Sequence, residues 1–257
     1  MLGLTKAKCN WEWTAYGKHP AASDYFHIGG SDPMVKAFFG WLEAGYQKLL
    51  SSKTERKQLH SWRFWSQGMK KDTIACGVCR DSSDSLGRPY PLTVMGVGAL
   101  PEWKDHWDLL PAVFDSIWAQ IEYVIARRFG ELDQLEVDLK RIGMPSPNWS
   151  HGDGRRLNTG PGTPDMCSHE RSLISSSNGF KKGVDGLLTH GEFCVCLDNN
   201  EGGDFLRLVI AWSRALRARG NMVPSSMFVG GLPERSHIAV FKRSLNANDF
   251  VRLWSIS

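Results

Sequence analysis

Hydrophobic residues along the chain follow two periods, one typical of helices and one typical of strands. Asp32-Pro33 can begin a helix, because Asp is a favoured cap and Pro suits the first helical position. After this start, apolar residues recur at helical spacing at Val35, Phe38, Phe39, Leu42 and Tyr46. This pattern predicts a helix from about residue 33 to residue 50.

The same patterns predict the other elements. Helices are expected at 105–129, 132–141, 205–219 and 246–254, and strands at 11–16, 61–66, 73–79, 92–100, 192–197, 226–229 and 237–241. Several strands follow one another too closely for helical crossovers, so the sheet should be mixed and mostly antiparallel. The expected fold class is therefore α/β, an α-β-α sandwich around such a sheet.

One segment, residues 143–186, shows neither period. It is dense in Gly, Pro, Ser and Asn and has few large apolar residues. A stretch this long without periodicity is interpreted as a loop or insertion. We expect a single domain over residues 1–257 that carries this insertion, since the length fits one large globular domain.

Composition restricts the class of protein. Hydrophobic residues make up 42% and charged residues 23% of the chain, which is ordinary for a soluble protein. The N-terminus lacks the apolar region of a signal peptide, and no apolar run approaches the length of about 18 residues that spans a bilayer. Six cysteines without an export signal suggest reduced thiols in the cytoplasm. The net charge of +4 is mild, and Arg214, Arg217 and Arg219 are interpreted as a solvated helix face rather than a nucleic-acid site.

Candidate catalytic and metal-binding residues are few. Cys76 and Cys79 form a CxxC pair, but zinc normally needs four ligands, so buried strand positions are favoured. The chain contains no G-x-S-x-G, H-E-x-x-H or G-x-x-x-x-G-K-[ST] motif. We expect no metal, no cofactor and no catalytic residues. The alternative, a small-molecule enzyme, would use residues near the Gly-rich segment: His151, Asp153, His190 and Cys194.

The most constrained segment is Gly87-Arg88-Pro89-Tyr90-Pro91-Leu92. Each proline fixes its own φ and favours extended geometry in the residue before it, so Arg88 and Tyr90 should lie in a stiff strip at a sheet edge or a strand entrance. Physical reasoning favours a structural role in which Tyr90 packs inward. The alternative is that Arg88 and Tyr90 form a partner-docking surface.

Several motifs in series resemble the TagF/ImpM family of proteins associated with type VI secretion. A short strand is followed by Gly17-Lys18-His19-Pro20 and by Asp24-Tyr25, and a helix then carries Trp41-Leu42. Next come a Trp-x-Phe motif, a Gly-Val pair that leads to an acidic residue, and the Gly-Arg-x-Tyr-Pro-Leu motif: Trp62, Phe64, Gly77, Val78, Asp84 and the segment 87–92. In the C-terminal half, Ser226-Met227-Phe228 stands where the family tends to carry a Ser followed by two tryptophans.

The resemblance implies a cytoplasmic, non-catalytic regulator of type VI secretion in a Gram-negative bacterium. Family members are thought to repress secretion by sequestering a forkhead-associated scaffold protein. A structural component of the secretion apparatus is a further alternative. Neither nucleic-acid binding nor stable membrane insertion is expected. The candidate partner-binding positions are the motif residues Gly17, Lys18, Pro20, Asp24, Trp41, Trp62, Phe64, Asp84, Gly87, Arg88, Tyr90, Pro91 and Ser226.

Overall fold

The structure is a computed structural model. It describes residues 11–52, 59–127, 129–147, 149, 178–197, 205–219 and 222–256.

The centre of the molecule is one eight-stranded sheet with the strand order β2-β1-β5-β4-β3-β7-β8-β6. The strands are β1 (Glu12–Gly17), β2 (Phe26–Gly29), β3 (Ser61–Gln67), β4 (Thr73–Arg80), β5 (Leu92–Ala99), β6 (Glu192–Cys196), β7 (Ser226–Gly231) and β8 (Ser236–Phe241). Every described strand pair is antiparallel. The expectation of a mostly antiparallel sheet is therefore confirmed.

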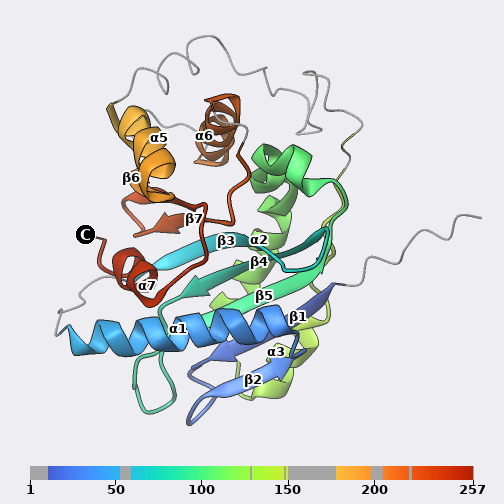
Figure 1. Cartoon of the computed structure of the whole chain (residues 1–257). Helices are drawn as coiled ribbons and strands as arrows, with labels where there is room; N and C mark the ends of the chain where they lie inside the picture. The colour runs from blue at the N-terminus through green and yellow to red at the C-terminus, as the bar shows by residue number, and fades with distance from the viewer. Residues whose placement is uncertain are drawn as a thin grey trace, which may run out of the picture.

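Helices cover both faces of the sheet (Figure 1). They are α1 (Pro33–Ser51), the 3-10 helix η1 (Trp103–Leu109), α2 (Leu110–Ala126), α3 (Leu132–Leu139), α5 (Asn178–His190), α6 (Phe205–Arg219) and α7 (Ala247–Leu253). One core cluster joins the sheet to α1 and α7, and a second joins its other face to η1, α2, α3, α5 and α6. The fold is thus the expected α-β-α sandwich.

Helix α1 begins where its sequence predicts. The Asp32 side chain accepts a hydrogen bond of 2.8 Å from the Met34 amide, and Pro33 occupies the first turn. The apolar stripe of the helix is buried against the sheet and against Phe250 of α7. Figure 1 shows α1 lying across one face of the sheet, in front of β5 and β1.

Three elements differ from the sequence prediction. The single helix expected at 105–129 is divided into η1 and α2 and ends at Ala126. Strand β2, which pairs with β1, was not predicted, because its four residues are too few for alternation to be recognised. Helix α5 begins at Asn178, so the interpretation of 143–186 as a loop is wrong for its last residues. Residues 148 and 150–177 of that segment lie outside the described part of the chain.

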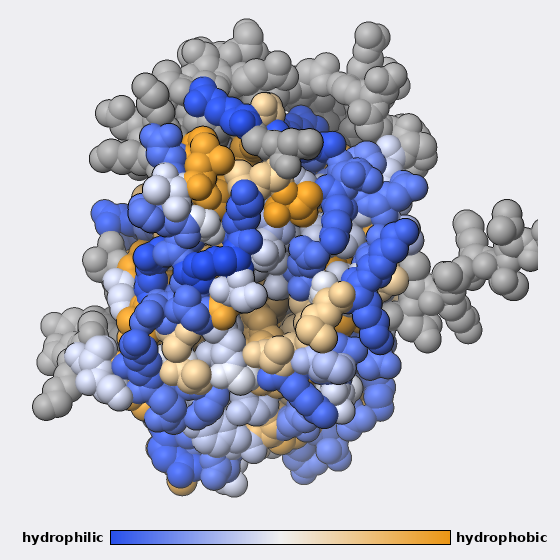
Figure 2. Space-filling model, in the orientation of Figure 1, coloured by the Kyte–Doolittle hydropathy of each residue, from blue (hydrophilic) through white to orange (hydrophobic). Residues whose placement is uncertain are grey.

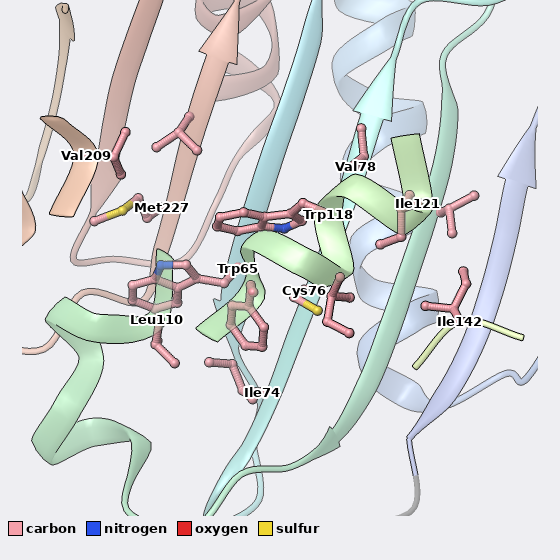
Figure 3. Packing of buried hydrophobic residues seen from close by; sticks show 14 of the residues in the cluster. Trp65, Ile74, Cys76, Val78, Leu110, Trp118, Ile121, Ile142, Val209 and Met227 are labelled. Atoms are coloured by element: carbon pink, nitrogen blue, oxygen red, sulfur yellow. The ribbon is translucent and has the colours of Figure 1, made fainter. Parts of the chain in front are cut away.

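The segment Trp103–Ala126 contradicts the expectation that no stretch is apolar enough to cross a membrane. In the described part of the chain it is one helical stretch whose length and composition would permit a span. In this fold, however, Leu110, Trp118 and Ile121 pack against Trp65 of β3 and Cys76 of β4 in the core (Figure 3). Its apolar character is therefore explained by burial against the sheet.

Candidate functional site

The carboxylate of Asp84 lies where two loops meet. Lys18, in the turn after β1, places its ammonium 3.0 Å from Asp84 Oδ2, and both side chains are almost completely buried. Two buried charges of opposite sign in contact are tolerated where one alone would be costly. The turn after β1 is thus joined to the loop between β4 and β5.

Asp84 also shapes its own loop. Its Oδ1 accepts hydrogen bonds from the amides of Leu86, at 3.0 Å, and Arg88, at 2.9 Å, and its Oδ2 accepts one of 2.7 Å from Arg88 Nε. Gly87 permits the tight turn because its φ is +76°. The loop is therefore held in one conformation by a single carboxylate.

Hydrogen bonds lower the pKa of the Asp84 carboxyl by more than burial raises it. Burial alone would raise its pKa, but bonds from the Arg88 amide, the Lys18 ammonium, the Arg88 guanidinium and the Leu86 amide hold the pKa well below its ordinary value of 3.8. Asp84 is consequently a carboxylate at neutral pH and is unsuited to serve as a general base.

Further contacts join the loop to residues 22–24. Ser85 donates its amide to the Ala22 carbonyl at 2.8 Å, and Arg88 Nη2 donates to the Ser23 carbonyl at 2.6 Å. Asp24 lies 3.8 Å from Arg88 and is largely exposed. The two loops therefore present one continuous surface.

Four of the five tyrosines of the chain gather beside this surface. Tyr90 lies edge-on to Tyr25 and Tyr46, each at 4.7 Å between ring centroids, and Tyr16 stacks on Phe39 at 4.4 Å. Tyr90 donates its hydroxyl to Glu43 at 2.8 Å, and burial together with this carboxylate raises its pKa far above 10. Tyr90 therefore stays protonated.

The motif segment 87–92 divides into an inward and an outward part. Tyr90 is 1% exposed and lies at the entrance to β5, so the docking role suggested for its side chain is wrong and the structural reading is supported. The Arg88 side chain is 49% exposed. Leu86, at 70%, and Tyr25, at 45%, are the large apolar side chains that stand out beside it.

The remaining motif residues lie in different places. Pro20 and Gly87 are exposed, whereas Gly17 and Pro91 are buried next to the site. Gly17 has a φ of +129°, and a Cβ there would collide with the Pro91 carbonyl oxygen. Four others belong to the core between the sheet and helices α1 and α7 and are too buried to touch a partner: Trp41, Trp62, Phe64 and Ser226.

Residues that sequence reasoning missed are Glu43, Tyr16, Tyr46 and Leu86. Glu43, Tyr46 and Tyr16 come from α1 and β1 and meet segment 87–92 only in the folded chain. The exposure of Leu86 likewise depends on the fold, so no local pattern marks these four as site residues.

The alternative enzymatic residues are not brought together where they are described. Cys76 and Cys79 lie buried in β4, as expected, and burial raises both of their thiol pKa values. Burial raises the pKa of Cys194 to about 11, and His190 is exposed at the end of α5. His151 and Asp153 lie outside the described residues.

One hollow of about 300 Å³ lies at the ends of β3, β4 and β7. Its walls include His60, Asp81 and Gly231 and none of the described candidate enzymatic residues. His60 contacts the Asp81 carboxylate at 3.3 Å and the Ile256 carbonyl at 3.1 Å, so both of its ring nitrogens already have partners. Within the described residues, no group of three or more His, Cys, Asp or Glu side chains is arranged to hold a metal.

The fold and the site define an α-β-α sandwich protein with an open antiparallel sheet and a rigid surface loop held by a buried ion pair. A solved structure with a similar fold is the crystal structure of PA0076 from Pseudomonas aeruginosa PAO1, at a TM-score of 0.53 and 17% identity, covering 94% of this chain and 93% of that one. No curated protein matches the sequence.

The family model for the TagF N-terminal domain, described as type VI secretion system-associated, matches residues 14–142. This range is half of the 257 residues. The chain therefore belongs to the TagF family of type VI secretion-associated proteins.

Proposed function

We propose that this protein is a non-catalytic, cytoplasmic, negative regulator of type VI secretion that binds and sequesters a forkhead-associated scaffold component. The observation that carries the proposal is the Lys18–Asp84–Arg88 network, which joins the loop that bears Leu86 to the segment that bears Tyr25, so that two exposed side chains lie on one ordered surface. A surface ordered before binding loses less entropy when it docks. This property suits a binding protein.

Sequestration would act by competition. Each scaffold molecule held by this protein is unavailable for assembly, so the regulator must match the scaffold in concentration and exceed the dissociation constant. Repression should therefore rise with the amount of regulator and saturate near equal amounts of the two proteins.

The test uses purified scaffold from the same host and a matched pair of double variants. Leu86→Ala/Tyr25→Ala removes the outward side chains of the loops, and Leu188→Ala/Tyr123→Ala removes similarly exposed ones from α5 and α2. We expect the first pair to weaken scaffold binding at least about tenfold, as truncation at interface centres does, and the second pair to have little effect.

Secretion in the native host provides the second readout. Overproduction of the wild type should reduce effector secretion, and the loop variant should lose this effect although it accumulates normally. Unchanged secretion together with no recovered scaffold would remove the proposal.

A further inference from the structure

Beside the Asp84 loop lies a second surface, built on β1, β2 and α1. Tyr16 and His27 are cross-strand neighbours on one face of the β1–β2 pair, and Phe39 of α1 lies against both rings. Tyr25 stacks at the side of Tyr16, at 6.5 Å between centroids. These four rings are partly or largely exposed and form the centre of what we term the acidic aromatic face.

Carboxylates lie on, or next to, the elements that carry these rings. Glu43 accepts hydrogen bonds from two neutral groups, Tyr90 Oη and Gln47 Nε2. Glu12 lies over Gly30 at the end of β2, and Asp32 caps α1. The carboxylates of the acidic aromatic face are Glu12, Asp24, Asp32 and Glu43.

The nearby cations do not balance this charge. Among the described residues of this region, the cations are Lys18 and Arg88, which are engaged by Asp84, and Lys36 on α1. Counted over its described residues and together with Asp84, the region holds five carboxylates against three cations, whereas the whole chain has a net charge of +4. The described part of this region is thus negatively charged, although the chain as a whole is positively charged.

The rings have a surface that suits cations. Lys18, which is buried, already places its ammonium 4.7 Å from the centroid of Tyr25. Ammonium and guanidinium groups bind the faces of aromatic rings, and nearby carboxylates strengthen the attraction. In the view of Figure 2, the lower part of the molecule shows mostly hydrophilic and intermediate colours.

We infer that the acidic aromatic face receives a basic segment of the protein partner, whose Arg or Lys side chains lie over Tyr16, Tyr25 and Phe39 and pair with Glu43 and Glu12. This inference rests on the proposed function, because it names the chemistry of the partner that the Asp84 region binds. We choose a basic segment as the occupant because its positive charge complements the carboxylates of the acidic aromatic face.

Two synthetic peptides of equal length test the chemistry directly, one alternating Arg and Leu and one alternating Glu and Leu. Titration into the full protein is followed by NMR of labelled tyrosine and phenylalanine. We expect the Arg peptide to shift the signals of Tyr16, Tyr25 and Phe39 and the Glu peptide to leave them unchanged. Equal binding of both peptides, or preference for the Glu peptide, overturns the inference.

A charge-removing variant and a control sharpen the test. Glu43→Gln keeps an acceptor for the Tyr90 hydroxyl but loses the charge, whereas Glu234→Gln removes an exposed charge in the β7–β8 turn. The first substitution should weaken both the Arg peptide and the scaffold about two- to fivefold, the range of an exposed ion pair, and the second should weaken neither.

The outcomes separate the inference from the proposed function. If the scaffold does not bind but the Arg peptide shifts the tyrosine signals and Glu43→Gln reduces this effect, the proposed function fails and the basic-segment inference stands. If the scaffold binds equally well to the wild type and to Glu43→Gln, the inference fails and the proposed function stands. A concentration-dependent dimer that Glu43→Gln disrupts would assign the face to self-association and also overturn the inference.

Discussion

At the scale of single residues, Asp84 is the group on which the surface loop depends. It replaces four hydrogen bonds to water with bonds to Lys18, Arg88 and two backbone amides. An Asn amide keeps one oxygen and could satisfy only part of this set, and Lys18 would remain buried without a counter-charge.

Asp84→Asn is therefore expected to lower the free energy of unfolding at pH 7. Because the folded-state pKa of Asp84 lies below the unfolded value of 3.8, its contribution is present above that value and is lost as the pH falls through the folded pKa. Urea unfolding from pH 7 to pH 2.5 should show the difference between wild type and variant narrowing below about pH 4. A constant difference over this range would show that the ionised carboxylate is not the cause.

Arg88→Ala should show whether Arg88 serves mainly the stability of the fold or mainly the order of the surface loop. Both amides hold Asp84 in either variant, but Arg88→Ala keeps the buried Lys18, whereas Lys18→Ala leaves the half-exposed Arg88 as the cation bonded to Asp84. The melting temperature should therefore fall less in Arg88→Ala than in Lys18→Ala. Amide exchange at Leu86 and Arg88 should quicken, because the loop loses its bond to the Ser23 carbonyl. A melting temperature as low as that of Lys18→Ala would instead make Arg88 a folding residue.

At the scale of elements, the contact between α1 and α7 is limited by a glycine. A Cβ built on Gly45 would lie 2.2 Å from Phe250 Cβ, whereas one on Gly40 of the same helix meets nothing within 4 Å. The two positions share helical geometry and differ in the space around them.

This contrast predicts that substitution by alanine changes the free energy of unfolding in opposite directions at the two glycines. Gly40→Ala should stabilise the protein by about 0.5–1 kcal/mol, because alanine loses less backbone entropy in a helix. Gly45→Ala should destabilise it by about 1–3 kcal/mol net, because the added methyl group forces the two helices apart. Chemical denaturation of both variants provides the measurement, and stabilisation by Gly45→Ala would contradict this packing.

At the scale of the whole molecule, the family-matched range 14–142 is not a closed unit. Its strand β3 lies between β4 and β7, and β7 comes from the C-terminal half. The core under α1 is also completed from outside the range, by Phe228, Phe241, Phe250, Leu253 and Trp254.

A fragment of residues 11–142 should consequently fail to fold cooperatively. It would expose the edge of β3 and the apolar side of α1, both of which favour aggregation. Thermal unfolding by circular dichroism and sedimentation would compare it with the full chain, and co-expression with residues 178–257 should restore solubility. A monomeric fragment with a sharp transition would refute the prediction of a single domain over residues 1–257.

Local sequence was sufficient for most elements and for the family. The periodicity of α1 and the β-branched run of β5 are set by side chains a few residues apart, and short-range sterics and burial act over that distance. The motifs around Lys18, Asp84 and Arg88, and their order along the chain, can likewise be recognised in the sequence.

What the tertiary structure alone decided is which distant segments meet. Three features depend on how the whole sheet assembles between its two core clusters. They are the pairing of Lys18 with Asp84, the hydrogen bond of the buried Tyr90 to Glu43, and the position of β7 beside β3. The sequence could not decide between a structural and a docking role for segment 87–92. In an extended segment the side chains point alternately to opposite sides, and which side is buried depends on the elements that pack against it. Burial of Tyr90 and exposure of Leu86 and Tyr25 follow from that placement, since each apolar side chain can be removed from water only where another element covers it.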